Sequence, residues 1–273
     1  MAINLTTKYA QKTVDKFYEE SVIAGWTNKD YSWDGSKSII VSTIVTQEPG
    51  DYTRSGVSRY GTPTDVQDTI QTLSITQDKS VSLVVDKGDA KQQTIVKNAG
   101  KVLALEIREQ FVPMCDKYAL SKWNEGRGSN IVLASPTKAN IVGAISDTLK
   151  ELGNKSVKAD GVMIYIGWSN FAKLLQAPEF LNLEKLGVKA LENGALGMLF
   201  GMKVKPVPDS YLPEGVNFMA VNKKSALLPF QIKENKVHLD PPGIPGSLME
   251  VRYLYDAFVL NELKGGIVSC TTA

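Results

Sequence analysis

The sequence predicts an α+β protein that carries a long two-stranded arm. Three features predict this class: two strand patterns around a turn in the first third, one helical pattern longer than the others, and a strand-rich final quarter. With 273 residues, 43% of them hydrophobic, the chain can bury a substantial core as one large or two modest domains.

The arm occupies residues 36–86. Its outgoing strand, residues 38–46, ends before the turn signal Glu48-Pro49-Gly50. On the return strand, residues 72–85, odd positions are mostly apolar and even positions mostly polar, which predicts a half-buried strand about 46 Å long at roughly 3.3 Å per residue. Because a lone two-stranded ribbon is at best marginally stable in water, its apolar face must lie on the rest of the chain or on a neighbouring copy.

The tip of the arm, residues 51–61, is rich in glycine, arginine and tyrosine. Arginine is enriched at protein interfaces, where its forked donors suit carboxylates. We therefore predict an inter-subunit contact, against the alternative of a solvated loop, at Tyr52, Arg54, Arg59 and Tyr60. In the turn-rich segment before the arm, Trp26 and Trp33 are predicted to dock on a surface, because burying their rings removes a large apolar area from water.

Two helices are expected after the arm. The longer one begins at the N-cap candidate Asp89, repeats apolar residues every four positions, is kinked or interrupted at Pro113, and ends after Trp123. A second helix is expected from Ser135-Pro136, an N-cap followed by proline at the first helical position, to Gly153.

The second half of the chain mixes strands with short helices. A helix is expected from Ser169, and Pro206 and Pro208 mark residues 202–208 as an edge strand, because proline cannot donate to a ladder. The other expected strands are residues 162–167, 218–221, 231–233, 236–239, 249–260 and 266–270.

The residues that could carry chemistry are few. The single histidine, His238, lies in a strand pattern, the two cysteines are far apart, and no phosphate-binding loop is present. We predict no catalytic, metal-binding or cofactor-binding residue, and no enzyme activity. The near balance of 31 Lys+Arg and 29 Asp+Glu argues against a protein that mainly grips nucleic acid. No secretory signal or membrane-spanning run is visible, so the chain is expected to stay in the cytoplasm where it is made.

The order of these parts resembles the HK97-fold major capsid proteins of tailed bacteriophages over essentially the whole chain. The segments that carry the resemblance are the tip and return strand Arg59-Tyr60-Gly61-Thr62-Pro63-Thr64-Asp65-Val66-Gln67-Asp68-Thr69-Ile70-Gln71-Thr72-Leu73, then Val85-Asp86-Lys87-Gly88-Asp89, Tyr118-Ala119-Leu120-Ser121-Lys122-Trp123 and Gly197-Met198-Leu199-Phe200-Gly201-Met202-Lys203-Val204. None of them is a catalytic motif, so the likeness lies in their order and spacing.

The resemblance implies an HK97-like capsid fold with four parts. These are an N-terminal arm (1–35), an extended β-hairpin loop (36–86), a peripheral domain with a long spine helix (87–132 and 232–273) and an axial α/β domain (133–231). The implied function is a major capsid protein that assembles as pentamers and hexamers into an icosahedral shell. Such a shell encloses double-stranded phage DNA without sequence-specific binding.

The same resemblance implies partners and a location. A separate scaffolding protein and a portal protein are expected, with assembly in the bacterial host cytoplasm, a final place in the virion and no membrane. Some members of the family cross-link a lysine of the extended loop to a neighbour. Residues 51–61 contain no lysine, so a non-covalent grip is expected here.

Three alternatives remain open from the sequence. An encapsulin-like nanocompartment shell protein would share the fold and enclose an enzyme. A homo-oligomeric cytosolic enzyme could exchange the arm between subunits. A phage tail or tube protein also joins subunits with long hairpins, but such proteins are expected to be rich in strands and to lack the long helix.

Overall fold

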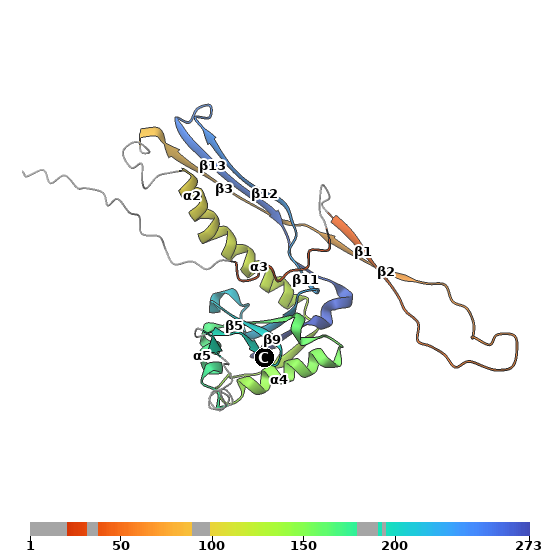
Figure 1. Ribbon diagram of the computed structural model, residues 1–273. Coiled ribbons are helices and arrows are strands. Elements are labelled where there is room, and N and C mark those ends of the chain that lie inside the picture. The colour runs from red at the N-terminus through yellow and green to blue at the C-terminus, as the bar shows by residue number, and fades with distance from the viewer. Residues whose placement is uncertain (1–20, 32–37, 89–98, 179–190, 193–194) are drawn as a thin grey trace, which may run out of the picture.

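The computed structural model describes residues 21–31, 38–88, 99–178, 191–192 and 195–273 (Figure 1). Two larger sheets are joined by one long helix, and a two-stranded ribbon projects away from both sheets. Asp89, the expected N-cap, and Trp33 lie outside the described residues.

The first sheet has three antiparallel strands in the order β12-β13-β3: Phe230–Leu239, Gly246–Tyr255 and Gln77–Asp86. Alternate residues of β13 face inward, as the period of two in a strand requires. Their buried side chains are Met249, Val251, Tyr253 and Tyr255. This face packs on the long helix, where Leu103, Phe111 and Cys115 belong to the same cluster.

The long helix has three consecutive segments: α2 (Ala99–Glu106), a π-helical turn (Ile107–Phe111) and α3 (Val112–Glu125). The irregular turn ends two residues before Pro113, which has no N–H to donate to the preceding turn. The interruption expected at Pro113 is therefore present as a π-helical turn. Further along, Ala119, Leu120 and Trp123 of α3 are fully buried in a second cluster.

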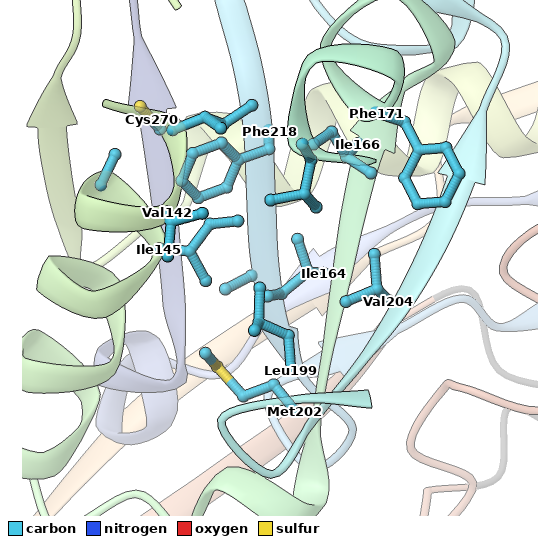
Figure 2. Close-up of a cluster of buried hydrophobic side chains, with 14 of the residues drawn as sticks. Val142, Ile145, Ile164, Ile166, Phe171, Leu199, Met202, Val204, Phe218 and Cys270 are labelled. Carbon is cyan, nitrogen blue, oxygen red and sulfur yellow. The ribbon is translucent and has the colours of Figure 1, made fainter. Parts of the chain in front are cut away.

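The second sheet has six strands in the order β4-β15-β10-β5-β9-β8. Their bounds are Ser129–Val132, Ile267–Thr271, Val216–Asn222, Val162–Gly167, Met202–Val207 and Met198–Leu199. Helices α4 (Ile141–Asn154) and α5 (Trp168–Leu175) contribute to the core on one face, where Ile145, Ile164 and Phe218 meet (Figure 2). Trp123 of α3 packs with Tyr165 and Met219 on the other face.

Short elements complete the fold. Three 3-10 turns cover Ala159–Gly161, Asp209–Tyr211 and Asn261–Gly266. Two small pairs are β6 (Leu191–Glu192) with β7 (Ala195–Leu196), and β11 (Ala226–Leu227) with β14 (Phe258–Val259).

Several expected elements differ in the structure. The strands expected at residues 231–233 and 236–239 form one strand, β12, and the strand expected over residues 249–260 ends at Tyr255 as β13. The return strand does not run unbroken along the arm: β2 ends at Ser74, and β3 pairs with β13 instead of with the outgoing strand. The second helix begins at Ile141, not after Ser135, because the Asn140 side chain accepts the N–H of Thr137 at 2.7 Å and donates to the Ser135 carbonyl at 3.0 Å, which closes a turn first.

The strands β4 and β15, which lie within residues 87–132 and 232–273, both belong to the six-stranded sheet. The cause is pairing at long range, since β15 lies between β4 and β10 and pairs with β10 over most of its length. The exact domain boundaries stay predictions.

Candidate inter-subunit contact surface

The ribbon is formed by β1 (Ser38–Ile44) and β2 (Asp68–Ser74), which pair antiparallel. Its inner face packs on the body of the same chain: Ile39, Val41 and Leu73 share a cluster with Leu227 and Leu260. The base of the ribbon therefore has a core of its own chain beneath it.

The outer face of the ribbon carries three exposed isoleucines. Ile40, Ile44 and Ile70 are 66%, 68% and 64% exposed. Ser42 lies opposite Ile70, so Ile70 is diagonal to both of the other isoleucines on the same face. We define these three residues as the isoleucine face. Such an exposed apolar group on a ribbon indicates a contact with another molecule.

The junction between β2 and β3 is fixed by the buried carboxylate of Asp256. Its Oδ2 accepts the backbone N–H of Thr76 at 2.9 Å and the Thr76 hydroxyl at 2.8 Å. Its Oδ1 accepts the Tyr118 hydroxyl and the N–H of Ala257, both at 2.8 Å. Burial, together with the bond to Asp256, raises the pKa of Tyr118. The strand path, the long helix and the segment after β13 thus meet at one side chain.

A second set of bonds holds the base of the ribbon. The amide Nε2 of Gln71 donates to the carbonyl of Val259 at 3.0 Å, and its Oε1 accepts the N–H of Asn261 at 2.9 Å. Both ends of one side-chain amide are used, which fixes β2 against β14 and the turn that follows it.

The tip is a loop with several internal contacts. The rings of Tyr52 and Tyr60 meet edge to face with centroids 5.1 Å apart. The N–H of Thr53 donates to the carbonyl of Arg59 at 3.1 Å, and Nε of Arg59 donates to the carbonyl of Gly56 at 3.2 Å. All four predicted contact residues are exposed, and neither Arg54 nor Arg59 pairs with a carboxylate in the part of the chain that the structure describes.

The segment before the arm is attached to the body through Trp26. Its Nε1 donates to the carbonyl of Val221 at 3.1 Å, and Nζ of Lys203 lies 4.8 Å from its ring centroid. At the start of this segment, the buried Asp116 accepts the N–H of Val22 at 2.7 Å and the hydroxyl of Ser21 at 2.8 Å. Trp26 thus lies against the sheet, whereas Trp33 is outside the described residues.

Across the described ranges, no three His, Cys, Asp or Glu side chains are grouped as a metal would require, and no helix there is long and apolar enough to cross a membrane. His238 lies on β12, as expected, with Nε2 3.3 Å from Glu250. Burial raises the pKa of Cys115 and of Cys270 to about 11, so both thiols are protonated at neutral pH.

The isoleucine face was not predicted from the sequence. Ile40 and Ile44 stand at even positions of the outgoing strand, and Ile70 stands at an even position just before the expected return strand, residues 72–85. Apolar residues at these positions were the signal in the sequence for an exposed apolar face. Only the strand register, however, brings the three residues together.

No protein-family model matches the sequence, and no curated protein matches it. Solved structures do match. A chain of Mycobacterium phage Che8 is 18% identical with a TM-score of 0.75, and the alignment covers 99% of each chain. A chain in the capsid of cyanophage P-SCSP1u is 10% identical with a TM-score of 0.81, over 98% of this chain and 93% of that one.

A third match lies in the mature capsid of bacteriophage PhiM1. It is 12% identical with a TM-score of 0.78, over 98% of this chain and 92% of that one. These alignments run through the ribbon, the long helix and both sheets, because they cover nearly the whole chain. The chain therefore has the HK97-like fold of phage capsid proteins, in agreement with the fold expected from the sequence.

Proposed function

We propose that this chain is the major capsid protein of a tailed bacteriophage. Copies assemble as pentamers and hexamers into an icosahedral shell around double-stranded DNA. The observation that carries the proposal is the projecting ribbon, whose base is fixed to its own chain and whose isoleucine face is open, in a chain with a capsid fold along its whole length.

The ribbon supports this function through burial. Covering an isoleucine side chain stabilises a contact by about 1.5–3 kcal/mol, before the entropy lost on association. One ribbon thus supplies a modest contact, and a closed shell repeats it at every subunit. The tip adds Arg54 and Arg59 as polar contacts, and with no lysine in residues 51–61 this grip is non-covalent.

The proposal has further parts that concern partners and place. A scaffolding protein and a portal protein take part in assembly, assembly proceeds in the bacterial host cytoplasm, and the finished shell is part of the virion. Its role is structural rather than enzymatic, and it encloses DNA without reading its sequence.

Deletion of residues 50–62 tests the proposal. The full-length chain is expected to form closed shells in electron micrographs, and the deleted chain to stay soluble and folded but unassembled. Sedimentation velocity measures the assembled fraction, and circular dichroism checks the fold. Normal particles from the deleted chain would show that the arm is not an assembly device. Nucleic acid that co-purifies with the particles would indicate a viral shell, whereas a co-purified enzyme would indicate a nanocompartment.

A further inference from the structure

The six-stranded sheet has a basic hollow at one end. It lies where β4, β5 and β15 begin and β10 ends, and its volume is about 1040 Å³. Two carboxylates line it, Asp160 and Glu262. Six cationic residues line it as well, and we use the name basic hollow for the cavity that they surround: Arg127, Lys155, Lys158, Lys223, Lys224 and Lys264.

Most of these cations have no partner within the hollow. Arg127 donates to the carbonyl of Asn124 at 2.8 Å, and Lys155 donates to the carbonyl of Gly128 at 2.9 Å and to the hydroxyl of Ser129. The other four lysines are exposed and pair with no carboxylate among the described residues. The net charge of the whole chain is close to zero, but the basic hollow has a local excess of positive charge. An anion from another molecule would neutralise this excess.

The segment 38–77, which comprises the ribbon and the loop that joins its strands, has a net charge of the opposite sign. Residues 38–77 contain four acidic residues, which we call the acidic shank: Glu48, Asp51, Asp65 and Asp68. All four are exposed, and none forms an ion pair within the described part of the chain. The only basic residues of 38–77 are Arg54 and Arg59. Asp51 lies in the tip with them, whereas Glu48, Asp65 and Asp68 lie outside it.

We propose that the acidic shank of one copy lies in the basic hollow of a second copy. The proposal rests on the proposed function, because it names the surface that receives the ribbon. The shank projects away from its own body and so is presented to a neighbour (Figure 1). Each copy offers one shank and one hollow, so a closed ring of copies neutralises every hollow. Complementary charges of this kind fix the register of an interface and suppress wrong contacts.

The phosphates of nucleic acid are the other anion that such a hollow could bind. The shank is favoured because the complementary surface is already present in the same chain, one per hollow, and because the whole chain lacks the basic excess of proteins that grip DNA. DNA binding is therefore an outcome to be tested, with a labelled double-stranded oligonucleotide as the probe.

A charge exchange tests the contact. The hollow variant is Lys223→Glu with Lys264→Glu, the shank variant is Glu48→Lys with Asp65→Lys, and the third protein combines all four changes. The control, Lys138→Glu with Lys150→Glu, makes the same charge change at exposed lysines outside the hollow. A milder pair, Lys223→Gln with Lys264→Gln, keeps the test valid if charge reversal disturbs folding.

Sedimentation velocity at low and high salt gives the result. Each reversal alone is expected to raise the protein concentration needed for half assembly about tenfold, and the combined protein to return within about twofold of the unaltered chain. The control pair should assemble normally. A combined protein that assembles no better than the single variants overturns the proposal.

Another outcome also overturns it: normal assembly of the hollow variant with a weakened affinity for the oligonucleotide would assign the hollow to nucleic acid. Failure of the unaltered chain to form shells, both alone and together with its scaffolding protein, would instead reject the proposed function. The two failures are thus distinguishable.

Discussion

Thr76 donates both its backbone N–H and its hydroxyl to one carboxylate oxygen of Asp256, at 2.9 and 2.8 Å. Thr76 stands between β2 and β3, where the chain passes from the ribbon to the three-stranded sheet. Asp256 is 4% exposed and also receives Tyr118 of the long helix. The direction in which the ribbon leaves the body is therefore set by a buried, fully bonded carboxylate.

Asp256→Asn is expected to lower the free energy of unfolding by about 2–3 kcal/mol, because an amide offers one acceptor oxygen to four donors and turns an NH₂ group toward some of them. Urea denaturation followed by tryptophan fluorescence measures the loss. The control is Asp147→Asn, an exposed carboxylate on α4, for which the midpoint should not move. Equal midpoints for both variants would show that Asp256 does not hold the junction.

The two faces of the ribbon should respond differently to substitution. Ile40→Ser with Ile44→Ser removes exposed side chains, so the isolated subunit should keep its stability while shell formation is lost. Leu73→Ser, on the inner face and 4% exposed, should lower the free energy of unfolding by about 2–4 kcal/mol. Sedimentation and urea denaturation measure both effects. Normal shells from the isoleucine variant would exclude this face as a contact.

The tip arginines should contribute through charge. Arg54→Glu with Arg59→Glu is expected to weaken assembly most at low salt, where charges are least screened. Arg54→Lys with Arg59→Lys keeps the positive charge but loses the forked donors. An intermediate effect of this pair on assembly would measure the contribution of the forked hydrogen bonds apart from that of the charge. Assembly of the glutamate pair that matches the unaltered chain at every salt concentration would indicate a solvated loop.

Two glycines make a matched pair for backbone strain. At Gly246, φ is +151° and an added Cβ would lie 2.1 Å from the carbonyl oxygen of Val85, so Gly246→Ala should destabilise the chain by at least about 2 kcal/mol. At Gly143 in α4 nothing lies within 4 Å, and Gly143→Ala should stabilise it by about 0.5–1 kcal/mol. Thermal unfolding of both variants is the measurement. Unchanged stability of Gly246→Ala would contradict the close pairing of β13 and β3.

The two buried thiols predict that the stability of the fold depends on pH. Burial raises the pKa of Cys115 and of Cys270 from 9.0 to about 11, so the stability due to the uncharged thiols is present below pH 9 and is lost as the pH rises toward 11. At pH 8 a thiol reagent should react at least about a hundredfold more slowly with the native chain than with the urea-unfolded chain, because both thiols are buried and a smaller fraction of each is thiolate. Equal rates would show that the thiols are accessible.

Local patterns in the sequence predicted the local elements well. The strand at residues 162–167 was expected with its observed bounds, because a buried apolar run ends at Gly167, and the helix after it follows directly. The interruption of the long helix followed from Pro113. The predicted start of α4 was wrong because Ser135-Pro136 has the composition of a helix cap. The hydrogen bonds of Asn140 that delay the helix depend on side-chain geometry, which the sequence pattern does not show.

Long-range pairing was beyond the sequence patterns. Alternation is the same in β2 and β3, since both are half buried, and it does not reveal that β3 pairs with β13, far along the chain. The tip residues were visible from composition, although their contacts stay a prediction. The isoleucine face needed the register of β1 with β2, and the basic hollow gathers residues from four separate parts of the chain.

The route of the chain through Thr76 also has a mechanical consequence. The strand that leaves the ribbon continues as β3, which pairs with β13 from Gln77 to Asp86. A force applied to the ribbon by a neighbour, such as pressure from inside a filled shell, pulls β3 along its own length. The hydrogen bonds of the ladder then share the load in shear instead of opening one after another, so tension is resisted by the whole strand pair.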